Sequence, residues 1–140
     1  MAKVGRLTPP RKAGMLGLGS LRYTTEEWKL NVAIEDDLAE YYRSLIPKYY
    51  KVNRPKYPPH ITVVRNEEII NKEAWKKYEG KEVEFQYSPI IQRGTVFWWL
   101  NAYCDFLLEL REELGLPPYN DLTKPPDKKS CFHLTIGNMK

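Results

Sequence analysis

Apolar and polar residues alternate along several short stretches of the chain, as they do in strands that bury one face. In residues 28–35, Leu30, Val32 and Ile34 share one face, and polar or small residues occupy the other. This alternation predicts a strand over these residues. The same pattern, or a run of β-branched residues, predicts further strands at 60–65, 82–91, 95–103 and 131–138.

Helical spacing of apolar residues occurs in two longer stretches. Two aspartates at 36–37 are typical of the first turn of a helix, and Pro47 ends the pattern. The apolar face expected for this helix consists of Leu38, Tyr41, Tyr42 and Leu45. A second helix is predicted over 104–116, with Gly115 at its C-terminal end, and a short helix over 71–79. The elements therefore fall into two similar halves, each with a strand, a helix, a loop and a strand.

The first twenty residues are rich in glycine, proline and basic residues, which predicts a loose N-terminal arm over 1–20. The length fits a single domain, 1–140. No stretch approaches the run of about 20 apolar residues that a membrane span requires, and the arm has no signal-peptide core. We therefore expect a soluble cytoplasmic protein with no membrane partner. Cys104 and Cys131 are expected to be reduced thiols.

The chain is moderately basic, with a formal net charge of +4 and an isoelectric point of about 9.0. This balance suits a compact anionic substrate such as a phosphate ester. A small excess of lysine that keeps a protein soluble gives the same balance, so charge alone leaves both interpretations open. Four basic residues gather in one proline-marked loop: Lys48, Lys51, Arg54 and Lys56.

The sequence contains two histidines, and each is followed two positions later by a threonine, in PPHITVV at 58–64 and CFHLTIG at 131–137. Side chains two positions apart on a strand share a face, so His60 lies beside Thr62 and His133 beside Thr135. With seven threonines in 140 residues, both pairs would arise by chance roughly once in 400 sequences. An imidazole titrates near neutral pH and a hydroxyl donates to phosphate oxygens. Two such pairs can therefore supply a general base, a general acid and two phosphate contacts.

These paired motifs resemble the His-hydrophobic-Thr motifs of the 2H phosphoesterase superfamily, over the two motif strands and their separation of 73 residues. The resemblance implies an α+β, bilobal 2H phosphoesterase (LigT-like) fold. Its two pseudo-twofold-related lobes would line a central groove with antiparallel sheets and carry helices outside. The resemblance also implies that one histidine, either His60 or His133, deprotonates the attacking 2′-hydroxyl or water, and that the other protonates the leaving oxygen. Thr62 and Thr135 would bind the non-bridging oxygens.

Members of this superfamily act on RNA ends with 2′,3′-cyclic phosphates, oligoadenylates, ADP-ribose cyclic phosphate and cyclic oligonucleotides. This short chain is similar in size and plan to phage enzymes that destroy the cyclic-oligonucleotide messengers of bacterial CBASS immunity. The similarity implies hydrolysis of 3′–5′ phosphodiester bonds in such messengers, in the host cytoplasm if the protein is phage-encoded. The alternatives are an RNA 2′,3′-cyclic phosphodiesterase or RNA-end processing enzyme, and a non-catalytic nucleotide-binding sponge.

Aromatic residues are the candidates for binding a substrate base by stacking: Tyr23, Trp98 and Trp99. Trp98 and Trp99 are adjacent on a predicted strand, so one is expected to face the groove and the other the core. Arg65 should lie on the face opposite His60, unless a bulge intervenes.

Other chemistries are less consistent with the sequence. Cys131 and His133 alone are too few ligands for a metal site. A cysteine nucleophile at Cys131 would leave the pair His60 and Thr62 unexplained. We therefore expect no metal, no cofactor and no obligate protein partner, and a cyclic or short oligonucleotide as the substrate.

Overall fold

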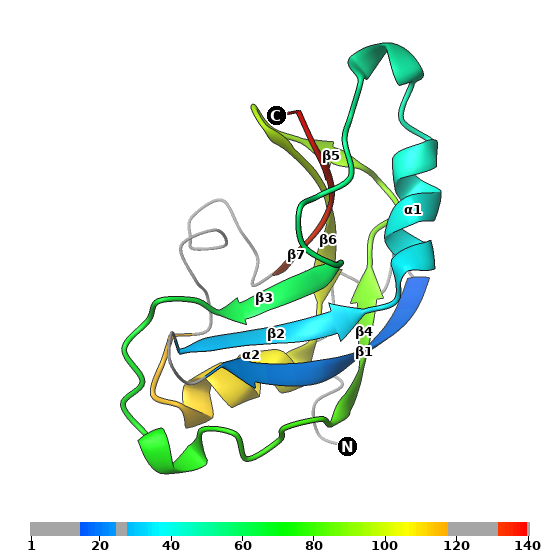
Figure 1. Cartoon of the computed structure of the whole chain (residues 1–140). Coiled ribbons are helices and arrows are strands. Elements are labelled where there is room, and N and C mark those ends of the chain that lie inside the picture. Colours follow the sequence, from blue (N-terminus) through cyan, green and yellow to red (C-terminus); the bar gives the residue numbers. More distant parts are fainter. Residues whose placement is uncertain (1–14, 25–27, 118–131, 140) are drawn as a thin grey trace.

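The computed structural model describes residues 15–24, 28–117 and 132–139. Within them the chain forms seven strands and two α-helices (Figure 1). Their bounds are β1 (Met15–Thr24), β2 (Lys29–Ile34), α1 (Asp36–Ser44), β3 (His60–Val64), β4 (Glu82–Tyr87), β5 (Gln92–Arg93), β6 (Phe97–Tyr103), α2 (Asp105–Glu113) and β7 (Phe132–Asn138). Single turns of 3₁₀ helix lie at Lys48–Tyr50 and Lys72–Ala74. Residues 1–14 of the expected arm, and Cys131, lie outside the described residues.

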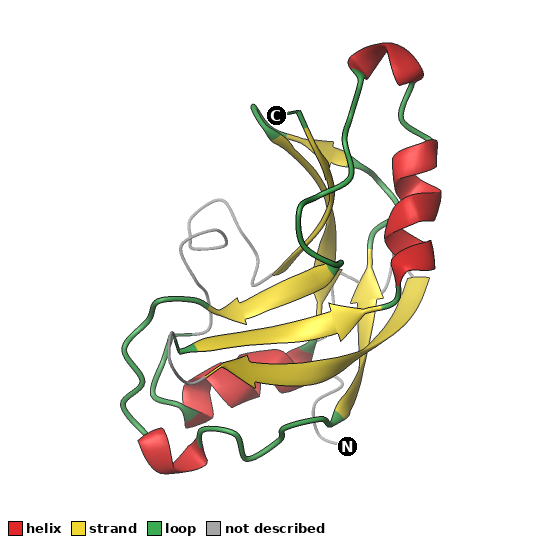
Figure 2. Ribbon diagram, in the orientation of Figure 1, coloured by secondary structure: helices red, strands yellow, loops and turns green. Residues whose placement is uncertain are grey.

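The strands form one antiparallel sheet in the order β4-β1-β2-β3-β7-β6-β5. A further antiparallel pairing joins β4 to β6 through Gln86↔Tyr103 and Tyr87↔Ala102. Within the described residues, this pairing closes six strands into a β-barrel, and β5 extends the sheet beside β6. Closure gives each of the six strands a neighbour on both sides, which leaves β5 as the edge strand of the described sheet. Figure 2 shows that strands predominate over helices.

The bilobal fold implied by the resemblance is therefore wrong. The strands close into one barrel accompanied by two helices, where two lobes with separate sheets lining a groove were expected. The physical reason is β1, whose first half was assigned to the loose arm. This strand pairs with β2 on one side and with β4 on the other, so it joins the two expected halves into a continuous sheet.

Two glycines explain why β1 does not resemble a strand in the sequence. A Cβ atom added to Gly17 would lie 2.5 Å from Cζ of Phe85. A Cβ atom added to Gly19 would collide with Val32 and with the carbonyl oxygen of Ala33. Neighbouring strands pack directly against the β1 backbone at both positions, which leaves room only for glycine. The glycines that suggested a loose segment are thus required by close packing.

The inner faces of the strands and one face of each helix form a single hydrophobic core. Val32, Ile61 and Leu134 are fully buried, as the alternation along their strands predicted. The helix expected over 71–79 is reduced to one 3₁₀ turn followed by turns, and Trp75 lies in the core. No helix within the described ranges is long and apolar enough to cross a membrane.

Helix α1 packs through a face that differs from the expected one. Ala39 and Tyr42 are buried, whereas Tyr41 and Leu45 are 58% and 53% exposed. The Tyr42 ring packs edge-on against Tyr87 of β4, with 5.8 Å between the ring centroids. The buried face runs through Ala39, Tyr42 and Ile46, so the helix is turned about its axis relative to the predicted face.

A buried arginine ties α2 to the end of β3. The side chain of Arg111 is completely buried, and its guanidinium donates hydrogen bonds of 2.8 and 2.7 Å to the two carboxylate oxygens of Glu67. It also donates to the backbone carbonyl oxygens of Val63 (2.6 Å) and Pro117 (2.7 Å). These four bonds compensate for the removal of a charge from water, which is otherwise strongly unfavourable.

A β-bulge lies where Arg111 contacts β3. The register between β2 and β3 shifts by one residue at this point, so Val63 has no directly opposed residue on β2. Val63 and Val64 are consequently both buried, and the next residue, Arg65, is exposed. A bulge of this kind changes the face on which all following side chains emerge.

Candidate functional site

Strands β3 and β7 are neighbours in the barrel, and they bring the two His-x-Thr motifs together. Ile61 pairs with Leu134 in antiparallel register, and both side chains are fully buried. Among the described residues of the two strands, only this pair is hydrogen-bonded in register. Continuing the antiparallel register by one residue on each side sets His60 opposite Thr135 and Thr62 opposite His133. These four side chains are partly exposed on the outer face of the barrel. We call them the His-Thr cluster.

The sheet sets the spacing within the His-Thr cluster. Cβ atoms of directly opposed residues on neighbouring strands lie about 4.5–5.5 Å apart, and those of diagonal neighbours about 7–8 Å apart. In the continued register His60 and His133 are diagonal neighbours, so their side chains start from one face with Cβ atoms about 7–8 Å apart.

Two asparagines extend the cluster onto the adjacent strands. Asn31 of β2 pairs with Thr62, and Asn101 of β6 pairs with His133. Their amide groups add hydrogen-bonding capacity on both sides of the cluster. Sequence reasoning missed both residues, because alternation shows which face a side chain occupies but not which strands lie side by side.

The ring of His60 is held by the proline pair that precedes it. Its Nδ1 atom lies 2.9 Å from the carbonyl oxygen of Pro58. A carbonyl oxygen only accepts hydrogen bonds, so Nδ1 carries the proton and donates it. In the neutral ring, Nε2 then keeps its lone pair. This tautomer is the one that a general base at Nε2 requires.

The ring of His133 is stacked on an indole. The centroids of Trp99 and His133 are 4.9 Å apart and their planes differ by 25°. Nε1 of Trp99 donates a 3.1 Å hydrogen bond to Oδ1 of Asn101, which fixes the indole plane. Aromatic faces attract cationic rings, so this stack orients His133 and suits a proton-donating imidazolium. Trp99 therefore lies at the cluster, as one of the two adjacent tryptophans was expected to, but His133 occupies one of its faces.

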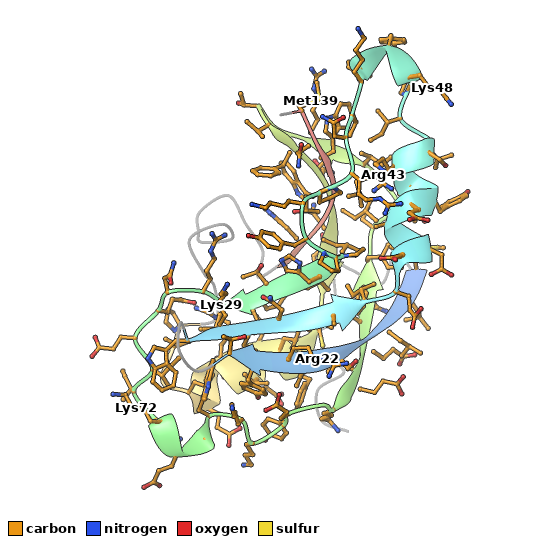
Figure 3. The ribbon with its side chains drawn as sticks, viewed as in Figure 1. Arg22, Lys29, Arg43, Lys48, Lys72 and Met139 are labelled. Atoms are coloured by element: carbon orange, nitrogen blue, oxygen red, sulfur yellow. The ribbon has the colours of Figure 1, made fainter. Side chains whose placement is uncertain are left out.

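Tyr23 and Trp98, the other two aromatic candidates, are in the core. Tyr23 is 8% exposed and packs edge-on against Trp75, with 4.8 Å between the centroids. Burial raises the pKa of the Tyr23 hydroxyl to about 12. Trp98 is 7% exposed, and its Nε1 donates to Sδ of Met139 at 3.1 Å, at the end of β7 (Figure 3). The prediction that these two rings stack on a base is therefore corrected, because both rings pack into the interior.

A groove of about 360 Å³ begins at the His-Thr cluster and extends across β3, β2 and β1. His60, Thr62 and Asn31 line one part of it. Three cationic side chains line another part of the groove: Arg22 of β1, Lys29 of β2 and Arg65 after β3. Figure 3 labels the first two, which come from neighbouring strands.

The position of Arg65 corrects the expectation that it faces away from His60. The β-bulge at Val63 was the stated exception, and it returns Arg65 to the face that carries the motif residues. The signal in the sequence was the adjacent pair of apolar residues, Val63 and Val64, which interrupts the alternation. In contrast, the basic loop 48–56 contributes no residue to the groove, and its Arg54 forms a 2.7 Å ion pair with Glu40.

Metal-binding side chains and cysteine thiols are the other reactive groups in the chain. Among the residues that the structure describes, no group of three or more His, Cys, Asp or Glu side chains is arranged to hold a metal ion. Cys104 is buried, and burial raises the pKa of its thiol to about 11, which disfavours a reactive thiolate. Cys131 lies outside the described residues.

Fold and site together define a class: a small antiparallel β-barrel protein with an imidazole–hydroxyl cluster on its outer surface, beside a basic groove. No protein-family model, curated protein or solved structure matches the chain.

Proposed function

We propose that this protein is a phosphodiesterase that cleaves nucleotide phosphodiester bonds at the His-Thr cluster without a metal ion. The observation that carries the proposal is the register of β3 and β7, which opposes two imidazole–hydroxyl pairs on one exposed face. General acid–base catalysis at phosphorus needs a proton acceptor and a proton donor on either side of the phosphate, and it needs donors to the non-bridging oxygens. The two histidines of the cluster can serve as the proton acceptor and the proton donor, and the two threonines as the donors to the non-bridging oxygens.

The local contacts of the two rings support a division of roles. His60 keeps Nε2 free to accept, so it takes the proton from the attacking 2′-hydroxyl or water as the new P–O bond forms. His133, oriented by Trp99, begins as the imidazolium and gives its proton to the leaving oxygen as the old P–O bond breaks. Thr62 and Thr135 donate hydrogen bonds to the non-bridging oxygens, whose negative charge grows in the transition state.

The proposed substrates are cyclic oligonucleotides. The groove beside the cluster has about the volume of a small-molecule site, and its charged lining is cationic. The paired motifs, which resemble those of the 2H phosphoesterases, support the same reaction type. A linear RNA ending in a 2′,3′-cyclic phosphate offers the same reacting group and serves as the comparison substrate.

The test is turnover in the presence of EDTA. The protein is incubated with cyclic dinucleotides, cyclic trinucleotides and RNA carrying a 2′,3′-cyclic phosphate, and the products are separated by chromatography. We expect linear products from the cyclic oligonucleotides, and a loss of about 10²–10⁴-fold in rate for His60→Ala and for His133→Ala. Thr62→Val should lose activity, whereas Thr95→Val, a matched change at an exposed turn, should not.

Three results would contradict the proposal. One is intact substrate across the whole panel. Another is an unchanged rate in either histidine variant that retains the wild-type circular dichroism spectrum. A third is tight nucleotide binding without turnover that survives both histidine substitutions, which would make the protein a sponge. Faster cleavage of the RNA ends than of every cyclic oligonucleotide would keep the chemistry and change the substrate.

A further inference from the structure

The groove beside the His-Thr cluster concentrates positive charge that the two-histidine mechanism does not use. Arg22, Lys29 and Arg65 reach it from three separate places in the chain. Among the described residues lining this groove none is acidic, and neither Arg22 nor Arg65 forms an ion pair with any described residue. Like charges that converge repel one another, so an anion that lies between Arg22 and Arg65 makes their arrangement more favourable.

The strand register places this cationic group at a defined distance from the reacting phosphate. Arg22 pairs with Asn31, and Asn31 pairs with Thr62 of the cluster. Neighbouring strands lie about 4.8 Å apart, so the backbone of Arg22 is roughly 10 Å from that of Thr62. The long arginine side chain can reach back over Asn31, which brings an anion on the groove to within about 5–10 Å of the cluster.

Arg65, the third cation, owes its position to the β-bulge in β3. Arg65 reaches the groove only because of the bulge at Val63, and the buried guanidinium of Arg111 donates to the carbonyl oxygen of that residue. Without the bulge, strand alternation would turn Arg65 toward the core side. A buried ion pair thus supports the exposed position of a second arginine.

We propose that Arg22, Lys29 and Arg65 bind a second phosphate group of the same substrate while the His-Thr cluster holds the phosphate that reacts. This inference rests on the proposed phosphodiesterase function and narrows the substrate class to nucleotides with at least two phosphates. A strand carries one charge for about every 3.4 Å of helix axis, so phosphates two or three nucleotides apart are separated by about 7–10 Å along the axis, which falls within this distance. Arginine forks suit phosphate oxygens because they can donate two parallel hydrogen bonds.

The experiment compares a substrate with two phosphates, cyclic di-AMP, with one that has a single phosphate, the dinucleoside ApA. The variants are Arg22→Gln, Arg65→Gln and the double variant, each checked for folding by circular dichroism. Arg54→Gln is the matched control, because it removes the same charge from an exposed arginine outside the groove. We expect the double variant to raise KM for cyclic di-AMP at least tenfold, to change ApA less than twofold, and to reduce the salt dependence of KM. The control should change neither substrate.

The outcomes separate this inference from the proposed function. Equal losses for both substrates, or no loss for cyclic di-AMP, would overturn the second phosphate site while leaving the phosphodiesterase intact. If the wild-type protein cleaves neither compound, the phosphodiesterase proposal fails, and calorimetric binding of cyclic di-AMP decides the inference. Weaker binding by the double variant supports the site, and unchanged or undetectable binding overturns it.

Discussion

Replacing Arg111 by methionine should strongly destabilise the protein and weaken its groove at the same time. Methionine has a similar length and fits a buried position, but it removes the hydrogen bonds that the guanidinium donates to Glu67, Val63 and Pro117. The change leaves the carboxylate of Glu67, whose side chain is 22% exposed, without its cation. It also leaves the carbonyl oxygens of Val63 and Pro117 without this donor.

The expected loss follows from these contacts. Removing one partner of a buried ion pair costs about 3–5 kcal/mol, because the remaining charge stays buried without compensation. Glu67 is partly exposed and can regain some water, so we expect the lower part of this range, about 3 kcal/mol. That is a large fraction of the roughly 5–15 kcal/mol by which domains of this size are stable. It corresponds to a decrease of about 10 °C in the melting temperature.

Urea unfolding followed by tryptophan fluorescence measures this loss, with Arg54→Gln as a control for the removal of a surface charge. The double variant Arg111→Met with Glu67→Met should recover part of the loss, because it removes the stranded carboxylate as well. A decrease below 1 kcal/mol for Arg111→Met would refute the reasoning. The reasoning would also be refuted if the double variant lost more free energy of unfolding than the sum of the losses in the two single variants.

Three further predictions concern single positions. Gly17→Ala should lower the free energy of unfolding by about 1–3 kcal/mol, because its Cβ would lie 2.5 Å from Phe85 Cζ; an unchanged melting temperature would contradict this. Burial raises the pKa of Cys104 from 9.0 to about 11, so its contribution to stability is complete below pH 9 and is lost as the pH rises through 11. Between pH 8 and pH 10.5, the free energy of unfolding measured with urea should then fall by about 2 kcal/mol more in the wild type than in Cys104→Ala. Trp99→Leu should lower kcat about tenfold with little change in KM if the indole positions His133, whereas a higher KM with unchanged kcat would indicate base stacking instead.

The local pattern of the sequence predicted most strands and the faces that they bury. Alternation identified the strands that contain Val32, Ile61 and Leu134, since each side chain's environment repeats every two residues along one segment. It failed at β1, because Gly17 and Gly19 are read as loop residues unless their neighbours on other strands are known. Barrel closure was equally hidden, because it depends on a pairing between β4 and β6 that no local pattern encodes.

The sequence likewise predicted the local features of the candidate site but not those that depend on the order of the strands. The shared face of His60 and Thr62 follows from spacing alone, and so does that of His133 and Thr135. The contributions of Asn31, Asn101 and Arg22 depend on which strands are adjacent, which a single sequence without homologues does not reveal. Tyr23 and Trp98 have aromatic side chains that serve a core as well as a ligand, so residue type could not decide between these roles.

The contact between β3 and β7 is the narrowest join in the barrel. It consists of one residue pair, Ile61↔Leu134, whereas β6 and β7 share six pairs, and it lies directly beneath the two imidazoles. Any opening of the ring at this join would move one imidazole away from the other and dismantle the site. A bound phosphate that contacts both β3 and β7 would link the two strands. Under the proposed function, the bound substrate would therefore stabilise the strand contact on which the site depends.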